Sequence, residues 1–331
     1  MGLIRILTNT LHPERYQGGH RKPPYFEGWY YKLVDASERH RYAVIPGLYR
    51  GSDWELSHAF VQFLDGMTGN VAYHRYPATA FAAMPGEFDL RVGPNRFTID
   101  GVGLDLEAPA ATVCGELTFS GVTPWPVTLR SPGIMGWYAW LPFMECYHGV
   151  LSLDHTIHGT LEVDGRVVDL SGGRGYTEKD WGRRFPAAHV WFQSNHLGQP
   201  GTSVTASVAV IPWLRGTFRG FIAGLWHRGR LYRFATYTGA RVERLSVTDR
   251  TVEWTLRDLT YCLQMSIQRN ATGLLYAPNL EDMSGRVAET IQATADVRLS
   301  KFKSGVESVV FDGKARNGGL EVVGDVARLV S

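Results

Sequence analysis

The sequence lacks the features that mark membrane-spanning, disulfide-linked or zinc-stabilised proteins. It has three cysteines, Cys114, Cys146 and Cys262, an odd number at wide spacing with no CxxC pair. This pattern argues against structural zinc, and a reducing, cytoplasmic compartment is expected. No stretch approaches the roughly 18 apolar residues of a membrane span. The N-terminal residues lack the sustained apolar core and cleavage site of a signal peptide.

The sequence also lacks an excess of charge of either sign. The 34 basic and 32 acidic residues give a formal net charge of +2, and the nearest approach to a basic run is Arg183-Arg184. A nucleic-acid-binding surface needs a basic patch or stripe, so nucleic acid is not expected as a partner. Hydrophobic residues make up 44% of the chain, enough for a full globular core.

Glycine is abundant, and its 37 residues separate short apolar or alternating runs. This spacing of glycines between short strand-like runs predicts an all-β protein, a sandwich or barrel of many short strands. Three hairpins are predicted, with arms at 88–92 and 96–99, 218–226 and 231–237, and 241–247 and 251–257. Further strands are predicted at 42–48, 58–64, 161–170, 204–211 and 286–299. Only residues 274–283 suggest a turn or two of helix.

The glycine-rich segment at 171–175 is the most plausible seam between two lobes. It lies near the middle of the chain, so we expect an N-terminal β domain at 1–170 and a C-terminal β domain at 171–331. The segment does not match GxGxxG and no helical pattern follows it, which argues against a nucleotide-binding loop.

The first aromatic motif is Pro-Pro-Tyr-Phe-Glu-Gly-Trp-Tyr-Tyr-Lys at 23–32. In a strand, alternate side chains face opposite ways, so Glu27, Trp29 and Tyr31 share a face. They are candidate substrate-binding residues. The simpler interpretation is a first strand whose Glu27 pairs with a basic residue, because structural ion pairs outnumber catalytic acids.

A second motif, at 132–148, is strongly apolar and aromatic. It contains Trp137 and Trp140 and ends in Glu145 and His148. It forms either core or the wall of an apolar pocket suited to a lipid. The spacing of His148, His155 and His158 matches no familiar ligand pattern, so structural histidines are favoured and no metal is expected.

A third motif runs Tyr-Thr-Glu-Lys-Asp-Trp-Gly at 176–182. If it is extended, Tyr176, Glu178 and Asp180 share one face while Lys179 and Trp181 point the other way. Two neighbouring buried acids raise each other's pKa, which makes one of them a candidate general acid. A solvated turn in which these charges pair is the alternative.

A fourth motif, at 189–196, places Trp191, Gln193 and Asn195 on one strand face. Amides beside an indole suit either the wall of a site or a buried hydrogen-bond network. A Ser-His-Asp hydrolase is disfavoured, because the sequence has no G-x-S-x-G elbow and no α/β alternation.

Together these segments resemble tocopherol cyclase and its bacterial relatives. The resemblance rests on residues 24–30, 131–137, 178–182, 185–186 and 191–195, in that order along most of the chain. It implies two lipocalin-like β-barrels or sandwiches packed together. It also implies kinship with carotenoid 1,2-hydratases, in which an aspartate proposed to protonate a terminal isoprene double bond stands at the position of Glu178. The change from Asp to Glu adds one methylene.

The resemblance implies a cofactor-independent reaction. Glu178 protonates an alkene of an isoprenoid or prenylated phenol, aromatic walls stabilise the cation, and a phenol oxygen closes the ring. Asp180, Tyr176 or His148 takes the second proton. The candidate aromatic walls are Trp29, Trp137, Trp140, Trp181 and Trp191. A hydratase and a non-catalytic lipid carrier remain as alternatives. A lipid substrate is collected from solution or from a membrane surface, so a transient peripheral membrane contact is also expected.

Overall fold

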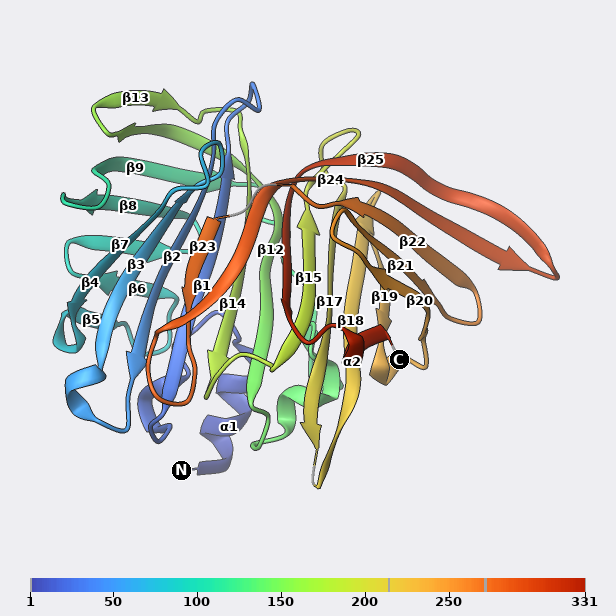
Figure 1. The fold of residues 1–331 in the computed structure, drawn as a ribbon, viewed down its shortest axis with the longest axis horizontal. Helices are drawn as coiled ribbons and strands as arrows, with labels where there is room; N and C mark the ends of the chain where they lie inside the picture. The colour runs from blue at the N-terminus through green and yellow to red at the C-terminus, as the bar shows by residue number, and fades with distance from the viewer. Residues whose placement is uncertain (1, 214, 271–272, 331) are drawn as a thin grey trace. The chain divides into compact units, whose positions relative to one another are not determined.

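The computed structural model describes residues 2–213, 215–270 and 273–330, and it is built almost entirely of antiparallel strands (Figure 1). The chain divides into two compact units. The first comprises Met1–Phe185 with Leu274–Arg286, and the second comprises Pro186–Gly273 with Val287–Ser331. The all-β prediction is therefore confirmed. Among the described residues, no helix is long and apolar enough to cross a membrane.

Within the described residues, the first sheet has 12 strands. Its order is β4-β3-β2-β1-β14-β12-β9-β8-β7-β6-β5, with β13 paired to β12. The strands are β1 (Tyr25–Val34), β2 (Arg41–Arg50), β3 (His58–Asp65), β4 (Val71–Pro77), β5 (Phe81–Ala83), β6 (Asp89–Val92), β7 (Asn95–Thr98), β8 (Gly101–Leu106), β9 (Val113–Ser120), β12 (Cys146–Val163), β13 (Arg166–Asp169) and β14 (Arg174–Gly182). Strand β14 thus lies at the centre, between the first strand of the chain and β12.

The second sheet has 11 strands in the part of the chain that is described. Its main order is β19-β18-β17-β15-β25-β24-β22-β21-β20, with β16 paired to β25 and β23 to β24. The strands are β15 (Ala188–Ser194), β16 (His196–Leu197), β17 (Ser203–Trp213), β18 (Gly216–His227), β19 (Arg230–Ala235), β20 (Arg241–Val247), β21 (Thr251–Arg257), β22 (Tyr261–Gln268), β23 (Gly273–Ala277), β24 (Gly285–Lys303) and β25 (Val306–Gly324).

Short elements complete the fold. Strands β10 and β11 form a separate two-stranded hairpin. The remaining elements are β10 (Val127–Thr128), β11 (Ser131–Pro132), the helices α1 (Gly2–Leu11) and α2 (Ala327–Val330), and the 3-10 turns η1 (Gly18–His20), η2 (Trp54–Leu56), η3 (Ala78–Ala80), η4 (Gly136–Trp140) and η5 (Thr236–Thr238). The sequence pattern did not predict α1.

The three predicted hairpins are present as β6–β7, β18–β19 and β20–β21. Two other predictions are wrong. The single strand expected at 161–170 is a hairpin, because Asp164 and Gly165 both adopt positive φ and reverse the chain between β12 and β13. Residues 274–283 hold the end of β23 instead of a helical turn.

The seam expected at 171–175 is not where the units divide. Residues 174–182 form the central strand of the first sheet, and the first unit extends to Phe185. The glycines at this point serve close packing: a Cβ on Gly173 would lie 2.2 Å from the carbonyl oxygen of Val34, and one on Gly175 would overlap the ring of His155. The glycine signal therefore reflects tight strand contact.

Each unit has its own hydrophobic core. In the first unit, Trp29, Tyr31 and Leu33 of β1 pack on one face of the sheet with side chains from β2, β3 and β6–β9. In the second unit, Val190 and Phe192 of β15 anchor a separate cluster. The core face of β1 is thus the face of its odd-numbered residues from 29 to 33.

A segment from late in the sequence completes the first unit. The side chain of Gln62 on β3 donates to the carbonyl of Tyr276 at 2.9 Å and accepts from its backbone N–H at 2.8 Å. The Tyr276 ring lies 4.4 Å from that of Tyr73 and beneath the guanidinium of Arg286. Met283 packs in a small apolar cluster with residues of β1–β3. Residues 274–286 are therefore held on the first unit by paired polar and aromatic contacts.

We predict that Gln62→Leu loosens this segment while leaving the rest of the unit folded. Loss of two hydrogen bonds worth about 1 kcal/mol each should raise proteolytic cleavage between 278 and 286 by about thirtyfold. Limited proteolysis with mass-spectrometric mapping measures this. Gln264→Leu on the exposed side of β22 is the matched control. Equal cleavage rates in the two variants would contradict the role given to Gln62.

Candidate functional site

Strand β14 carries two chemically different faces. In the antiparallel register Tyr30 of β1 lies opposite Glu178, and Val150 of β12 flanks Glu178 on the other side. Lys179 lies opposite Trp29. Even-numbered residues of β14 therefore share a face with Tyr30, and odd-numbered ones share the core face with Trp29. The predicted common face of Tyr176, Glu178 and Asp180 is present.

Glu178 is a buried acid held by a tyrosine. Its residue is only 4% exposed. The hydroxyl of Tyr176 donates to Glu178 Oε2 at 2.5 Å, within the same strand face. A β-bulge in β12 between Val150 and Ser152 lies beside Glu178. Bulges of this kind change the direction of neighbouring side chains and are frequent beside active sites.

His148 connects Glu178 to a more exposed acid. Its Nδ1 lies 2.9 Å from Asp180 Oδ1, and its Nε2 lies 3.5 Å from Glu178 Oε2. The Asp180 side chain is 29% exposed, while the Glu178 side chain is buried. Asp180, His148, Glu178 and Tyr176 thus lie in a row of titratable groups that leads from a partly exposed to a buried position. The third and second sequence motifs meet here because β12 and β14 are neighbours.

These same groups raise the question of a metal ion. Among the described residues, ligating atoms of His148, Glu178 and Asp180 all lie within 4.8 Å of one another. However, each carboxylate approaches a different nitrogen of the imidazole. An ion shared by both carboxylates would bind one ring nitrogen, so this arrangement fits proton transfer better.

The other two candidate histidines serve structural roles. His155 is buried, its Nδ1 lies 2.9 Å from the hydroxyl of Ser152, and burial lowers the pKa of His155 to about 3. His158 Nε2 lies 2.8 Å from the hydroxyl of Ser120. Each imidazole therefore has a serine partner, which agrees with the structural interpretation.

On the core face, Glu27 and Lys179 form an ion pair that is fully buried. Lys179 Nζ lies 2.6 Å from Glu27 Oε1, and both side chains are 0% exposed. Lys179 also donates to the carbonyls of Pro13 and Arg15, at 2.9 and 2.5 Å. Burial lowers the pKa of Lys179, and Glu27 acts in the opposite direction. The pairing of Glu27 with a basic residue, expected as the simpler interpretation of the first motif, is present.

The remaining bonds of this ion pair fix the N-terminal segment. Glu27 accepts from the backbone N–H of Gln17 at both oxygens and from the hydroxyl of Tyr25. The Gln17 amide donates in turn to the carbonyls of Asn9, His12 and Arg15. Residues 9–17 are thereby tied to the centre of the sheet.

Three aromatic candidates lie on this core face, across the sheet from Glu178. Lys179 Nζ sits 4.6 Å from the ring centroid of Trp29 and 4.7 Å from that of Trp181. Tyr31 packs in the core and donates to the carbonyl of Thr98. The expectation that Trp29, Tyr31 and Trp181 surround the same substrate as Glu178 is not supported, because strand alternation directs them to the opposite face.

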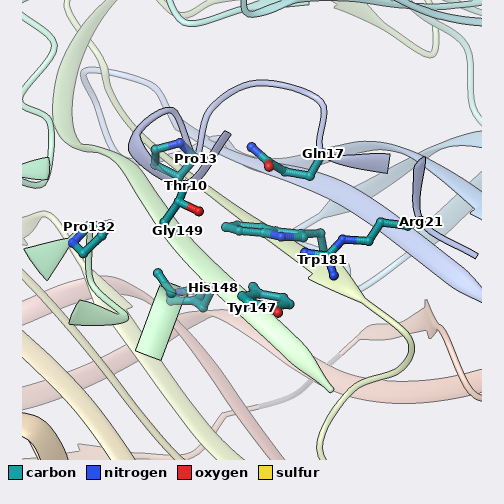
Figure 2. A pocket seen from close by; sticks show the side chains of 11 residues that line it. Thr10, Pro13, Gln17, Arg21, Pro132, Tyr147, His148, Gly149 and Trp181 are labelled. Carbon is teal, nitrogen blue, oxygen red and sulfur yellow. The ribbon is translucent and has the colours of Figure 1, made fainter. Parts of the chain in front are cut away.

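A pocket lies where the N-terminal segment meets the loop before β12 (Figure 2). It is a small hollow open to solvent, with a cavity volume of about 30 Å³. Trp181 lines it and stacks on Tyr147, with ring centroids 5.4 Å apart. His148 also lines it. Trp181, Tyr147 and Gly149 place most of this wall on the core face, and His148, whose ring contacts Glu178 on the other face, borders it.

The other candidate residues of the second motif, Trp137, Trp140 and Glu145, are exposed or half-buried. Trp137 is exposed and stacks on Tyr138 in η4. The Trp140 indole N–H donates to the carbonyl of Leu129. Glu145 pairs with Arg184 at 2.5 Å. This motif is thus neither simple core nor the wall of a closed cavity.

Trp191, Gln193 and Asn195 belong to the second unit. Gln193 is fully buried opposite Thr205 on β17, and Trp191 lies opposite Ser207 and Glu321. Within the described residues, neither polar atom of the Gln193 amide has a hydrogen-bond partner. The expected common face is confirmed for Trp191 and Gln193, since both point away from the core formed by Val190 and Phe192.

Sequence reasoning missed two residues on the acid face. Tyr30 lies opposite Glu178 and Lys32 lies opposite Tyr176, and both are buried. A buried lysine is unusual in itself. In the sequence, their even numbers place Tyr30 and Lys32 on the face of β1 opposite Glu27. Only the β1–β14 register shows that Glu178 lies on that same face of the sheet.

We predict that removal of one member of the buried ion pair is strongly destabilising. Lys179→Met should lower the free energy of unfolding by about 3–5 kcal/mol, because it leaves the Glu27 charge buried without a partner. The double variant Glu27→Leu with Lys179→Met should lose much less than the sum of the two single variants. Denaturant unfolding of the four proteins measures the coupling. Lys314 and Asp296 lie at the same 2.6 Å separation on the surface, and their cycle is the control. Additive effects at positions 27 and 179 would refute the prediction.

Comparison with known proteins gives the family. The tocopherol cyclase-like family profile matches residues 106–324, well over half of the chain. The chain is 28% identical over 119 residues to a protein of Oryza sativa subsp. japonica described as "Probable tocopherol cyclase, chloroplastic", covering 34% of this chain and 25% of that one. It is 29% identical over 110 residues to tocopherol cyclase of Zea mays, covering 31% and 23%. The chain thus spans about a quarter of these relatives' length.

Two solved structures share the fold. CghA with Sch210972 superposes with a TM-score of 0.56 at 12% identity, covering 91% of this chain and 89% of that one. Kievitone hydratase from Nectria haematococca superposes with a TM-score of 0.51 at 13% identity, with the same coverage of 91% and 89%. At these identities the likeness concerns the fold. The extent of the profile match, across both units, shows that the chain belongs to the tocopherol cyclase-like family.

Proposed function

We propose that this protein is an acid-initiated cyclase that closes a chromanol-type ring on a prenylated phenol. The observation that carries the proposal is the buried Glu178 carboxyl, bonded to Tyr176 and backed by His148 and Asp180. Membership of the tocopherol cyclase-like family supports the substrate class. The names of the rice and maize relatives support it as well.

In the first step, Glu178 donates its proton to the less substituted carbon of a trisubstituted alkene. The π electrons form the new C–H bond, and the other carbon becomes a tertiary cation. Burial favours the neutral form of a carboxyl, which is the form that can donate. Tyr30, opposite Glu178 on the neighbouring strand, is the candidate aromatic residue for stabilising the cation.

In the second step, the phenol oxygen of the same substrate attacks the cation. The new C–O bond closes the ring as the phenol O–H bond breaks, and the proton passes to His148. His148 and Asp180 form the route by which a proton returns to the Glu178 carboxylate. Substrate and product are isomers, so the step needs no external oxidant or reductant.

Deuterium incorporation tests this function. Wild-type protein incubated with a prenylated hydroquinone in deuterated buffer should give a cyclised product with one deuterium at a new C–H bond. Glu178→Gln should lower the rate by at least about a hundredfold, because the amide cannot donate the proton. Glu116→Gln, at an exposed position of β9, is the control and should be unaffected.

The outcomes separate the competing functions. A product heavier by one water in addition to the deuterium would indicate a hydratase. Binding of the hydroquinone by wild type and Glu178→Gln without turnover would indicate a carrier. Turnover abolished by a chelator and restored by a divalent ion would favour the metal interpretation of His148, Glu178 and Asp180 over the proton chain.

We further predict that Asp180→Asn impairs the return of the proton more than its first donation. The variant should complete about one turnover at nearly the wild-type rate and then slow about tenfold, because Glu178 recovers its proton slowly. Rapid-quench measurement of product against time detects such a burst. A linear time course at the wild-type rate would show that Asp180 does not belong to the proton route.

A further inference from the structure

The loop before β12 exposes large apolar side chains to solvent. Strands β10 and β11 pair Thr128 with Ser131, so Leu129 and Arg130 form the tip of a two-residue hairpin. Leu129 is 65% exposed, and Phe143, further along the same loop, is 56% exposed. Trp137 is 44% exposed. Three large apolar side chains exposed on one loop suit an interaction surface.

The loop is held in shape by its own contacts. The Trp140 indole N–H donates to the carbonyl of Leu129 at 3.1 Å, and Trp137 stacks on Tyr138 with ring centroids 4.1 Å apart. The Tyr147 hydroxyl donates to the carbonyl of Leu141. The exposed side chains are therefore presented by an ordered segment.

The two segments of the chain that meet at this loop contain basic residues and no acidic ones. Residues 121–144 contain no acid and one base, Arg130. Residues 15–26 contain no acid and include Arg21 and Lys22. Arg21 donates to the carbonyl of Pro142 at 3.5 Å and lies over the Tyr147 ring, which joins the two segments. The acids that border them are paired, Glu14 with Arg15 and Glu145 with Arg184.

We propose that residues 127–143, with Arg21 and Lys22, form a docking surface for an anionic lipid bilayer. Tryptophan and other aromatic side chains are favoured at the membrane interface, leucine and phenylalanine insert into the acyl region, and arginine and lysine bind acidic headgroups. The exposed set combines these three elements and contains no opposing carboxylate.

The position of this surface gives it a use. Both segments contribute to the lining of the pocket in Figure 2, Pro132 and Gly133 from the loop and Gln17 and Arg21 from the N-terminal segment. His148 lines the same pocket and lies 3.5 Å from Glu178 Oε2. A prenyl chain drawn from the bilayer would meet the protein at this hollow, which His148 borders; this last step rests on the proposed function, while bilayer binding does not.

Vesicle flotation tests the docking surface. The full chain should float with vesicles of phosphatidylcholine containing about a third phosphatidylglycerol, and much less with phosphatidylcholine alone. Leu129→Ser with Phe143→Ser should lower the bound-to-free ratio by about tenfold or more. Arg130→Gln should lower it about fivefold, and only on the anionic vesicles.

Matched exposed residues elsewhere supply the controls. Val167 lies on β13, at the opposite end of the first unit from α1 in Figure 1, and it is 72% exposed. The Val167→Ser variant should therefore leave vesicle binding unchanged. Circular dichroism and thermal melting confirm that all variants fold. The double variant Leu129→Ser with Phe143→Ser should turn over a soluble short-chain substrate at the wild-type rate. This comparison separates a loss of membrane docking from a loss of catalysis.

Three results would overturn the proposal. The wild-type chain could fail to float with anionic vesicles, or Val167→Ser could reduce binding as much as the loop variants do. In the third case, sedimentation would show that the wild-type protein self-associates, and that the double variant Leu129→Ser with Phe143→Ser is monomeric but binds vesicles as well as wild type does. That result would assign the loop to contact between copies of the chain.

Discussion

The buried ion pair between Glu27 and Lys179 is the constraint on which the first unit depends. It joins the first strand of the chain to the central strand and satisfies both charges without water. Its other hydrogen bonds reach backbone groups of residues 13–17, so the N-terminal segment and the sheet share one polar centre. Because an unpaired buried charge is costly, this arrangement strongly disfavours a shift of β14 against β1.

That constraint determines the geometry of the acid face. Residues 178, 179 and 180 alternate between the two faces, so the lysine that fixes the strand lies between two acids that face the other way. A slip of one residue would send Glu178 into the core and Lys179 to the opposite face. The ion pair therefore supports the proposed chemistry by fixing register, although it lies across the sheet from Glu178.

Strand alternation within one motif was predictable from sequence, and relations between motifs were not. The common face of Tyr176, Glu178 and Asp180 follows from the two-residue period of a strand. Contact between His148 and both acids depends on the β12–β14 register, which two bulges shift. The glycines at 171–175 suggested a boundary because turn glycines and close-packing glycines look alike in sequence. The surface position of Trp137 depends on a loop whose apolar composition equally suited a core.

The return of residues 274–286 to the first unit has a consequence for biosynthesis. This segment belongs to a unit whose other residues end at Phe185, and nearly ninety residues of the second unit lie between them. On the ribosome, the first unit cannot acquire its last contacts until the chain has been translated beyond Arg286, when most of the second unit already exists. Completion of the two units is thus coupled in time by chain connectivity, and no single cut of the polypeptide separates them whole.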